Sequence, residues 1–153
     1  MGFSWEDYQP GVTDYVEDWL DEAAVKFTGL DDGFRAFYEY WAGEDGYIPG
    51  ENFWAKVVFD NEEPFAVVAF AEYEGKVTIM EIVIAPEKRG RGMGTKMLQK
   101  LLAGDARIGF PIRKCEAVIF PDNIVSQRAF EKAGFSCHHT YEDGSAVLYS
   151  YET

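Results

Sequence analysis

The sequence RGRGMGTKMLQKLL, residues 89–102, places three alternating glycines directly before an amphipathic run. Helical periodicity predicts a helix over about 92–103 that buries Met97, Leu98, Leu101 and Leu102. Glycine is a poor helix former, so glycines at its start need another reason. The first turn of a helix has unpaired N–H groups and the positive end of the helix dipole, and glycines let an anion approach that backbone. The stretch therefore predicts a phosphate-binding turn; the alternative is a tight strand-to-helix connection without a ligand.

Two familiar phosphate-binding motifs do not fit this turn. A Walker A motif ends in Gly-Lys-Ser/Thr, whereas here Thr95 precedes Lys96. A dinucleotide-binding fingerprint has the spacing G-x-G-x-x-G, whereas Gly90, Gly92 and Gly94 give G-x-G-x-G. If the turn binds a phosphate group, it does so with neither of these two motifs.

The rest of the chain alternates between helical and strand patterns. Helices are predicted over residues 14–27, 33–42, 92–103 and 123–134. Strands are predicted over 53–60, 64–73, 77–86 and 114–120, followed by a hairpin that turns at Asp143 and Gly144. Asp14 with Glu17 resembles a capping box for the first helix, and Asp31 or Asp32 would cap the second. This order predicts a mixed α/β sheet with at least one parallel crossover.

The composition is that of a globular protein. The chain has 153 residues, 47% hydrophobic and 27% charged, which suits one domain over residues 1–153. No apolar run reaches the roughly 20 residues of a membrane span, and the N-terminus lacks a signal-peptide pattern, so no membrane partner is expected. Two cysteines, Cys115 and Cys137, are too few for a disulfide framework. We expect a cytoplasmic protein with reduced thiols.

Charge is distributed unevenly along the chain. The net charge of −13 argues against a nucleic-acid partner. Residues 88–132 hold ten of the 14 basic residues and four of the 27 acidic ones, which makes this segment +6 and the remainder −19. One interpretation is an acidic surface that keeps the protein dispersed by repulsion. The other is two opposed patches, one for an anion and one for a cation.

Two sequence motifs, one after the other along the chain, resemble motifs of the GNAT superfamily of N-acetyltransferases. Arg89-x-x-Gly92-x-Gly94, inside IVIAPEKRGRGMG, is similar to the family's R/Q-x-x-G-x-G/A signature after a strand. NIVSQRAFEKAGF, residues 123–135, resembles the family's downstream N-x-x-A/S-x-x-x-Y-E-K-x-G-F segment. The resemblance covers about residues 53–135 well, and the two ends fit by element order. It implies a mixed, mostly antiparallel twisted sheet, with a parallel pair of strands that splay apart and about four flanking helices.

The resemblance also implies an acetyl-CoA site, and we expect no metal. The cofactor would lie between the splayed strands, with its pantetheine arm along the backbone near Ile82, Val83 and Ile84. Its pyrophosphate would contact the turn residues Arg89, Gly90, Arg91, Gly92, Met93, Gly94 and Thr95. Asn123 would line the pantetheine path, and Lys132 and Arg128 would lie near phosphate. Many relatives are dimers, so a homodimer is compatible with the resemblance.

The implied reaction is direct attack of an amine on the thioester, which requires the amine to lose a proton. Glu81 is the leading candidate base, because it is the only charged residue between Val77 and Pro86 and relatives carry an acid near this position. The alternative is an inert, salt-bridged glutamate at a sheet edge or bulge. Glu72 on the neighbouring strand is a weaker candidate. A backbone N–H of Ile82, Val83 or Ile84 would stabilise the developing oxyanion.

The sequence departs from the family pattern at two positions. The family's usual proton donor to the CoA thiolate is a tyrosine seven residues after the asparagine, and Phe130 occupies that place beside the cofactor. Water, Ser126 or no dedicated acid would then serve. Ribosomal-protein alanine acetyltransferases carry a glutamate five residues before the asparagine, where this chain has Val118, which argues against that branch.

The remaining reactive residues indicate less. Cys137, His138 and His139 are consecutive in a predicted strand, so their side chains point to opposite faces and do not suit one metal ion. Aromatic side chains are expected to line a substrate pocket and contact an ammonium group through their π faces: Tyr47, Trp54, Tyr141 and Tyr149.

Three functions remain open from the sequence. The first is an acetyl-CoA-dependent N-acetyltransferase acting on a small cationic amine, such as a polyamine, an amino sugar or an amino-acid derivative. The second is a protein N-terminal or lysine acetyltransferase. The third is a CoA-binding module without catalysis, which Phe130 supports.

Overall fold

The computed structural model describes residues 2–44, 46, 48–106 and 112–153, so the predicted pocket residue Tyr47 lies outside the described residues. No helix within these ranges is long and apolar enough to cross a membrane. The elements, in chain order, are β1 (Phe3–Asp7), the 3-10 helix η1 (Asp14–Trp19), α1 (Glu22–Thr28), α2 (Phe34–Ala42), β2 (Asn52–Asp60), β3 (Glu63–Tyr73), β4 (Lys76–Ile84), the 3-10 helix η2 (Pro86–Lys88), α3 (Met93–Leu102), β5 (Lys114–Ile119), α4 (Ile124–Lys132), β6 (Ser136–Thr140) and β7 (Val147–Glu152).

One twisted sheet organises the fold, with the strand order β1-β2-β3-β4-β5-β7-β6. All neighbouring strands are antiparallel except β4 and β5, which are parallel and are joined through α3. The final hairpin is β6 and β7, and Gly144 in its turn has φ +72°. The predicted mixed, mostly antiparallel sheet with one parallel pair is therefore confirmed.

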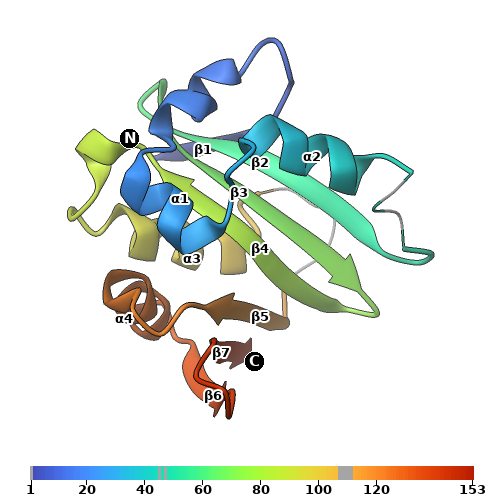
Figure 1. Ribbon diagram of the computed structural model, residues 1–153, viewed down its shortest axis with the longest axis vertical. Coiled ribbons are helices and arrows are strands. Elements are labelled where there is room, and N and C mark those ends of the chain that lie inside the picture. The colour runs from blue at the N-terminus through green and yellow to red at the C-terminus, as the bar shows by residue number, and fades with distance from the viewer. Residues whose placement is uncertain (1, 45, 47, 107–111) are drawn as a thin grey trace.

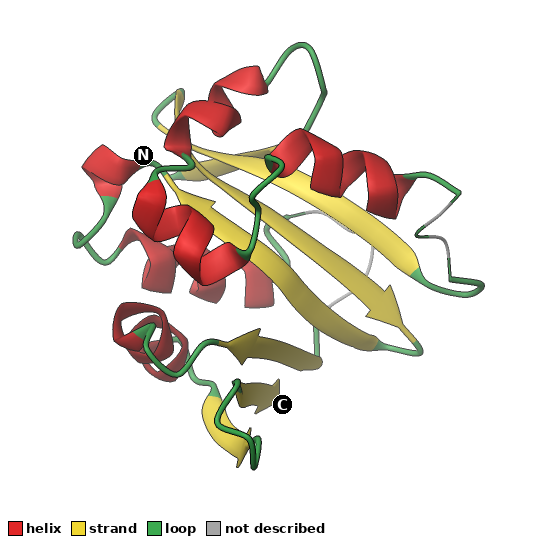
Figure 2. Cartoon of the chain, viewed as in Figure 1, coloured by secondary structure: helices red, strands yellow, loops and turns green. Residues whose placement is uncertain are grey.

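Helices cover both faces of the sheet (Figures 1 and 2). On one face, η1, α1 and α2 pack over β2, β3 and β4, with Val16 and Phe34 fully buried. On the other face lie α3 and α4, where Met97, Leu98 and Leu101 are buried as the helical periodicity predicts. Burying each such side chain contributes roughly 1.5–3 kcal/mol. The lower part of the sheet, β5, β7 and β6, has no helix in front of it in Figure 1.

The parallel pair separates part of the way along. β4 and β5 pair only over Lys76–Ile79 and Lys114–Ala117. β4 continues to Ile84 against β3, so its last five residues have no partner on the β5 side. This separation opens the sheet on the side where the glycine-rich turn follows β4.

A β-bulge in β4 marks the point of separation. Ala69 of β3 pairs with Glu81, and the next residue, Phe70, pairs with Ile79, so Met80 is an extra residue in β4. Ile79 and Ile82 both pack toward α3, although they are three residues apart, and Met80 packs toward α1 and α2. Strand alternation back from Ile82 places Glu81 on the α1 face as well. The bulge therefore directs two consecutive side chains to one side.

The predicted helix over residues 14–27 is wrong as one element. It is divided into η1 and α1 at Leu20, which has φ −85° and ψ 70°. Asp21 begins a new helix, because its carboxylate accepts a hydrogen bond from the Ala24 amide at 3.0 Å. The predicted stop at Gly29 is confirmed by its left-handed φ of +74°. The apolar periodicity continues through the break because side chains of both parts, such as Trp19 and Ala24, pack against the same core cluster.

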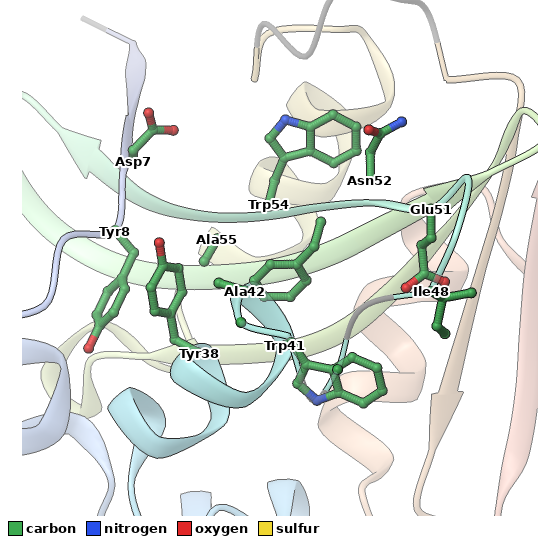
Figure 3. Close-up of a pocket in the computed structure, with 13 residues that line it drawn as sticks. Asp7, Tyr8, Tyr38, Trp41, Ala42, Ile48, Glu51, Asn52, Trp54 and Ala55 are labelled. Carbon is green, nitrogen blue, oxygen red and sulfur yellow. The ribbon is translucent and has the colours of Figure 1, made fainter.

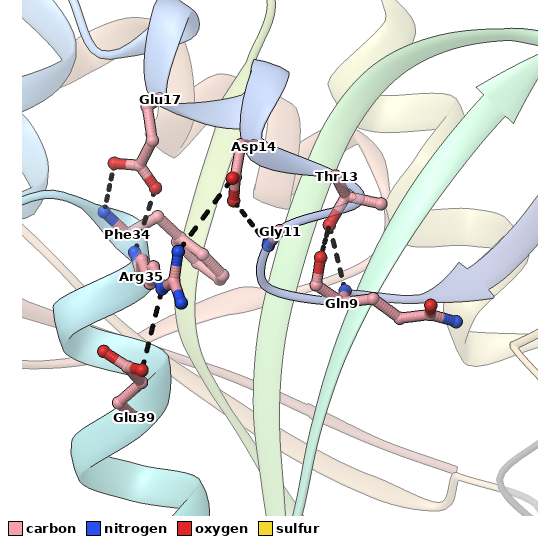
Figure 4. A network of polar contacts seen from close by, with 8 residues as sticks. All are labelled: Gln9, Gly11, Thr13, Asp14, Glu17, Phe34, Arg35 and Glu39. Carbon is pink, nitrogen blue, oxygen red and sulfur yellow. Dashed lines mark hydrogen bonds and ion pairs between the residues drawn. The ribbon is translucent and has the colours of Figure 1, made fainter.

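The predicted capping box of the first helix does not form, since its glutamate caps α2 instead. The Glu17 carboxylate accepts hydrogen bonds from the amides of Phe34 at 2.9 Å and Arg35 at 3.0 Å (Figure 4). Asp14 accepts from the Gly11 amide at 2.9 Å. The N-cap position of α2 is Gly33, which has no side chain to act as a cap, so neither Asp31 nor Asp32 serves. A carboxylate 17 residues earlier in the chain satisfies the helix N-terminus.

Candidate active site

A cleft of about 620 Å³ lies where β4 and β5 separate. Its walls come from α1, β4, the glycine-rich turn, α3, β5 and α4. Of the residues predicted for the site, Arg91 is exposed on the turn and is not among those found to line the cleft. The others do line it: Glu81, Ile82, Val83, Ile84, Arg89, Gly90, Gly92, Met93, Gly94, Thr95, Asn123, Ser126, Phe130 and Lys132.

The glycine-rich turn exposes the N-terminus of α3 to the cleft. Gly90 and Gly92 adopt left-handed φ values of +75° and +74°, which L side chains rarely adopt. Gly92 is the N-cap residue and supplies no side-chain cap, and the Lys96 amide donates to the Gly92 carbonyl. The three amides between them, from residues 93–95, are therefore first-turn donors at the positive end of the helix dipole. This geometry suits an anion.

Gly94 is required for a different reason, which is close packing. A Cβ on Gly94 would lie 3.2 Å from Cδ1 of Ile84, tighter than an ordinary contact. At Gly90 and Gly92, by contrast, an added Cβ would meet nothing within 4 Å. The first two glycines thus shape the turn, and the third lets α3 approach the end of β4.

The Arg89 side chain does not point to the phosphate position that the resemblance implies. Its guanidinium donates to the Asp21 carboxylate at 2.8 Å and to the Trp19 carbonyl at 3.1 Å, and Nε donates to the Ile84 carbonyl at 3.0 Å. The hydrogen bond from Arg89 is the main cause that lowers the pKa of Asp21, with the Ala24 amide second. Arg89 therefore joins the end of β4 to the end of η1 and the start of α1.

The backbone of β4 alternates its polar groups between β3 and the cleft. The Ala85 amide donates to the Phe65 carbonyl of β3 at 2.7 Å, so the backbone groups of Ile84 and Ile82 point the other way, toward the separation. The bond from Arg89 Nε to the Ile84 carbonyl agrees with this direction. The backbone of Val83, one of the three residues predicted to contact pantetheine, faces β3 instead.

Glu81 is the ionisable group of the cleft wall near the bulge. Burial raises its pKa from 4.5 to about 8, because the charged form is poorly solvated there. The structure shows no ion pair to Glu81 from any residue it describes, so the alternative of a salt-bridged, inert glutamate is not observed. Glu72, the weaker candidate, does not line the cleft and accepts hydrogen bonds from Gly75 and Asn52.

The α4 side of the cleft holds the residues around the predicted thiol position. Asn123 caps α4, with its Oδ1 accepting from the Ser126 amide at 3.2 Å. The Phe130 ring is buried against Phe135, with ring centroids 4.8 Å apart. Tyr149 was predicted to line a substrate pocket, and it does not, because it is 2% exposed and its hydroxyl donates to Glu131 at 2.9 Å.

A second cavity of about 420 Å³ lies between α2 and β2 (Figure 3). Aromatic rings of Tyr8, Tyr38 and Trp41 form part of its wall, and none of the residues at the strand separation line it. Trp54 also borders it, but its ring points to the opposite side of the sheet and stacks on Phe70 at 5.5 Å. Tyr141 is exposed beside His139. Among the described residues, no cluster of three or more His, Cys, Asp or Glu side chains could hold a metal ion.

A split sheet with helix N-terminal amides at the mouth of the split is an arrangement that suits an anionic ligand between two parallel strands. The family model described as the acetyltransferase (GNAT) family matches residues 13–135. Because this match covers most of the chain, the protein belongs to the GNAT acetyltransferase family and is an acetyltransferase.

Solved structures with the same fold are similar over almost the whole chain. The aminoglycoside acetyltransferase AAC(6')-Ib in complex with coenzyme A has a TM-score of 0.76 at 20% identity, over 99% of this chain and 95% of that one. A spermidine N-acetyltransferase from Vibrio cholerae, in complex with CoA and spermine, has a TM-score of 0.73 at 15% identity, over 97% and 94%. A GNAT acetyltransferase from Streptococcus pneumoniae has a TM-score of 0.68 at 17% identity, over 98% of each. These likenesses show the shared fold.

Proposed function

We propose that this protein is an N-acetyltransferase that moves the acetyl group of acetyl-CoA directly to the primary amine of a small cationic molecule. The observation that carries the proposal is one cleft that combines a helix N-terminus whose geometry suits an anion with a partly buried carboxyl group. Membership of the GNAT family and the CoA-bound relatives support the same reaction.

Acetyl-CoA fits the half of the cleft next to α3 and α4. Its diphosphate would accept hydrogen bonds from the amides of Met93, Gly94 and Thr95. Lys132 and Arg128, which both line the cleft, would add charge near the phosphates. The pantetheine arm would lie along β4, where the Ile82 backbone faces the cleft. The positive segment over residues 88–132 then has a ligand to match its charge.

The transfer step requires a neutral amine. Glu81 would accept one proton from the ammonium group, and the nitrogen lone pair would attack the thioester carbonyl carbon. The C–N bond forms, the C–S bond breaks, CoA leaves as a thiolate, and the nitrogen releases its second proton to water as the neutral amide forms. The Ile82 and Ile84 amides are the β4 donors directed at the separation, and the Ile82 amide, next to Glu81, would stabilise the developing oxyanion.

The thiolate must finally take up a proton. Phe130 cannot supply one, so water or the hydroxyl of Ser126, which lines the cleft, would do so. A thiol with a pKa of roughly 8.5 is readily protonated near neutral pH, so the absence of a tyrosine at this position does not prevent turnover.

Phe130 also favours a second candidate function. Phe130 at the position of the family's proton donor would also suit a CoA-binding module without catalysis. The two functions differ in whether acetyl-CoA is consumed when an amine is present.

The test is a thiol-release assay on the purified protein with acetyl-CoA and a panel of amines, with the product identified by mass spectrometry. We expect amine-dependent release of CoA and a product heavier by one acetyl group. The panel includes a lysine peptide and a peptide with a free N-terminus, to separate small-molecule from protein acetylation. Tight CoA binding by calorimetry, with no release above background for any amine, would instead identify the binding module.

A further inference from the structure

The half of the cleft that faces α1 is built almost entirely from apolar side chains. Ala23, Ala24 and Phe27 of α1 line it, together with Met80 of the bulge. Val118 and Phe120 line it from the other strand, and they are 55% and 43% exposed. Their direction follows from β5, where Cys115, Ala117 and Ile119 are buried toward α3 and α4. Val118 alternates with these residues, so it points to the α1 face, and Phe120, directly after β5, lines the same cleft.

This half of the cleft has few groups that could bind a polar substrate. The hydroxyl of Thr28 donates to the Ala24 carbonyl at 2.7 Å and accepts from the Leu30 amide at 3.2 Å, so it is already used. Glu81 is the one carboxyl group among the described residues that line the cleft.

Two acidic groups close to this half are paired with basic side chains. Asp21, at the start of α1, pairs with Arg89 at 2.8 Å. Glu116, on the same face of β5 as Val118, pairs with Lys76 at 3.4 Å. A substrate with a second ammonium group would therefore find a single carboxyl group, Glu81, among the described residues that line the cleft.

We propose, on the basis of the proposed function, that the acceptor is a primary monoamine whose nitrogen is carried on an apolar alkyl or aryl body. The nitrogen would lie at Glu81, and the body would contact Phe27, Val118 and Phe120. A second ammonium group, or the hydroxyls of a sugar, would lose water in this half without gaining hydrogen-bond partners. Polyamines and amino sugars would therefore be poor acceptors.

The test compares acceptors that differ in one group, with acetyl-CoA at saturation. Butylamine and 1,4-diaminobutane have the same carbon chain, and the second carries one more ammonium group. We expect kcat/KM for butylamine to exceed that for 1,4-diaminobutane by at least about tenfold, since the second ammonium has no partner. 2-Phenylethylamine should be at least as good as butylamine, because an aryl body also fits the apolar wall.

The possible outcomes separate this inference from the function on which it rests. If 1,4-diaminobutane or an amino sugar is acetylated as well as butylamine, the inference is overturned while the acetyltransferase function stands. If the protein binds CoA and acetylates none of the amines, the proposed function fails and the inference fails with it.

A pair of variants tests the position of the apolar body. Phe120→Glu adds a carboxylate to the wall, and Phe120→Gln adds a side chain of the same shape without the charge. We expect Phe120→Glu to raise the ratio of kcat/KM for 1,4-diaminobutane over butylamine at least about threefold relative to Phe120→Gln. Equal ratios in the two variants would show that the acceptor body does not contact this wall.

Discussion

The guanidinium of Arg89 lies 2.8 Å from the carboxylate of Asp21, 68 residues earlier in the chain. Two further hydrogen bonds from the same side chain reach the carbonyls of Trp19 and Ile84. One residue of the family signature thus holds the glycine-rich turn against the helix that forms the opposite wall of the cleft. Its side chain is occupied by these three hydrogen bonds, so the amides of the turn remain as the groups that could bind the ligand.

Replacing Arg89 by lysine tests this support. Lysine keeps the positive charge but cannot reach three acceptors in a fork, so the free energy of unfolding should fall by about 1–2 kcal/mol in urea denaturation. CoA affinity should fall less than in a variant of the turn glycines. Unchanged stability with abolished CoA binding would show that the guanidinium contacts phosphate instead.

Gly92→Val should weaken CoA binding at least about tenfold in calorimetry while the fold is retained. Valine at φ +74° is strained by roughly 1–2 kcal/mol, and relief of that strain turns the first amides of α3 away from the ligand. Gly75→Val is the matched control, because Gly75 has φ +86° and open space around it in the β3–β4 turn, away from the cleft. Equal loss of affinity in both variants would contradict a local role of Gly92.

Glu81→Gln should lower kcat/KM by about 10²-fold or more, with partial recovery at high pH. The wild-type rate should rise with pH up to the pKa of Glu81, about 8, because the base acts in its deprotonated form and burial keeps it protonated below that value. The variant should instead follow the deprotonation of the amine itself. Superimposable pH–rate curves for the two proteins would remove Glu81 as the base.

The cap that Glu17 provides for α2 predicts an effect on stability alone. Glu17→Gln weakens the charge-assisted hydrogen bonds to the amides of Phe34 and Arg35, so unfolding should become easier by about 1 kcal/mol. Glu39→Gln is the control, because its exposed pair with Arg35 contributes at most about 0.5 kcal/mol. If both variants had the same urea midpoint, the cap would not stabilise the fold.

Features set by neighbouring residues could be predicted from the sequence. The strands β2 to β5 and the start of α3 follow from alternation, from apolar periodicity and from glycines in a turn that needs left-handed φ values, whereas β1 is not predicted. The closing hairpin also follows from its own turn residues. The separation of the parallel strands came from the family resemblance, because no local pattern states how far two strands stay paired.

Features set by distant residues could not be predicted. The residues around Glu17 predict a local capping box, but in the fold its carboxylate accepts a hydrogen bond from the Phe34 amide of α2. The family resemblance predicts Arg89 as a phosphate ligand, but in the fold its guanidinium donates a hydrogen bond to Asp21. The bulge at Met80, which turns Glu81 toward α1, depends on the register with β3. Each of these three features depends on contacts with residues far away in the sequence, so the neighbouring residues alone do not predict it.

The central claim is that the first amides of α3 bind the diphosphate of CoA. The most direct measurement is an NMR titration of the ¹⁵N-labelled protein with CoA, following the backbone amides of Met93, Gly94 and Thr95. We predict that these amide protons move strongly downfield as hydrogen bonds to phosphate oxygens form. Saturation with CoA that leaves these three signals unmoved, while amides elsewhere shift, would contradict the account.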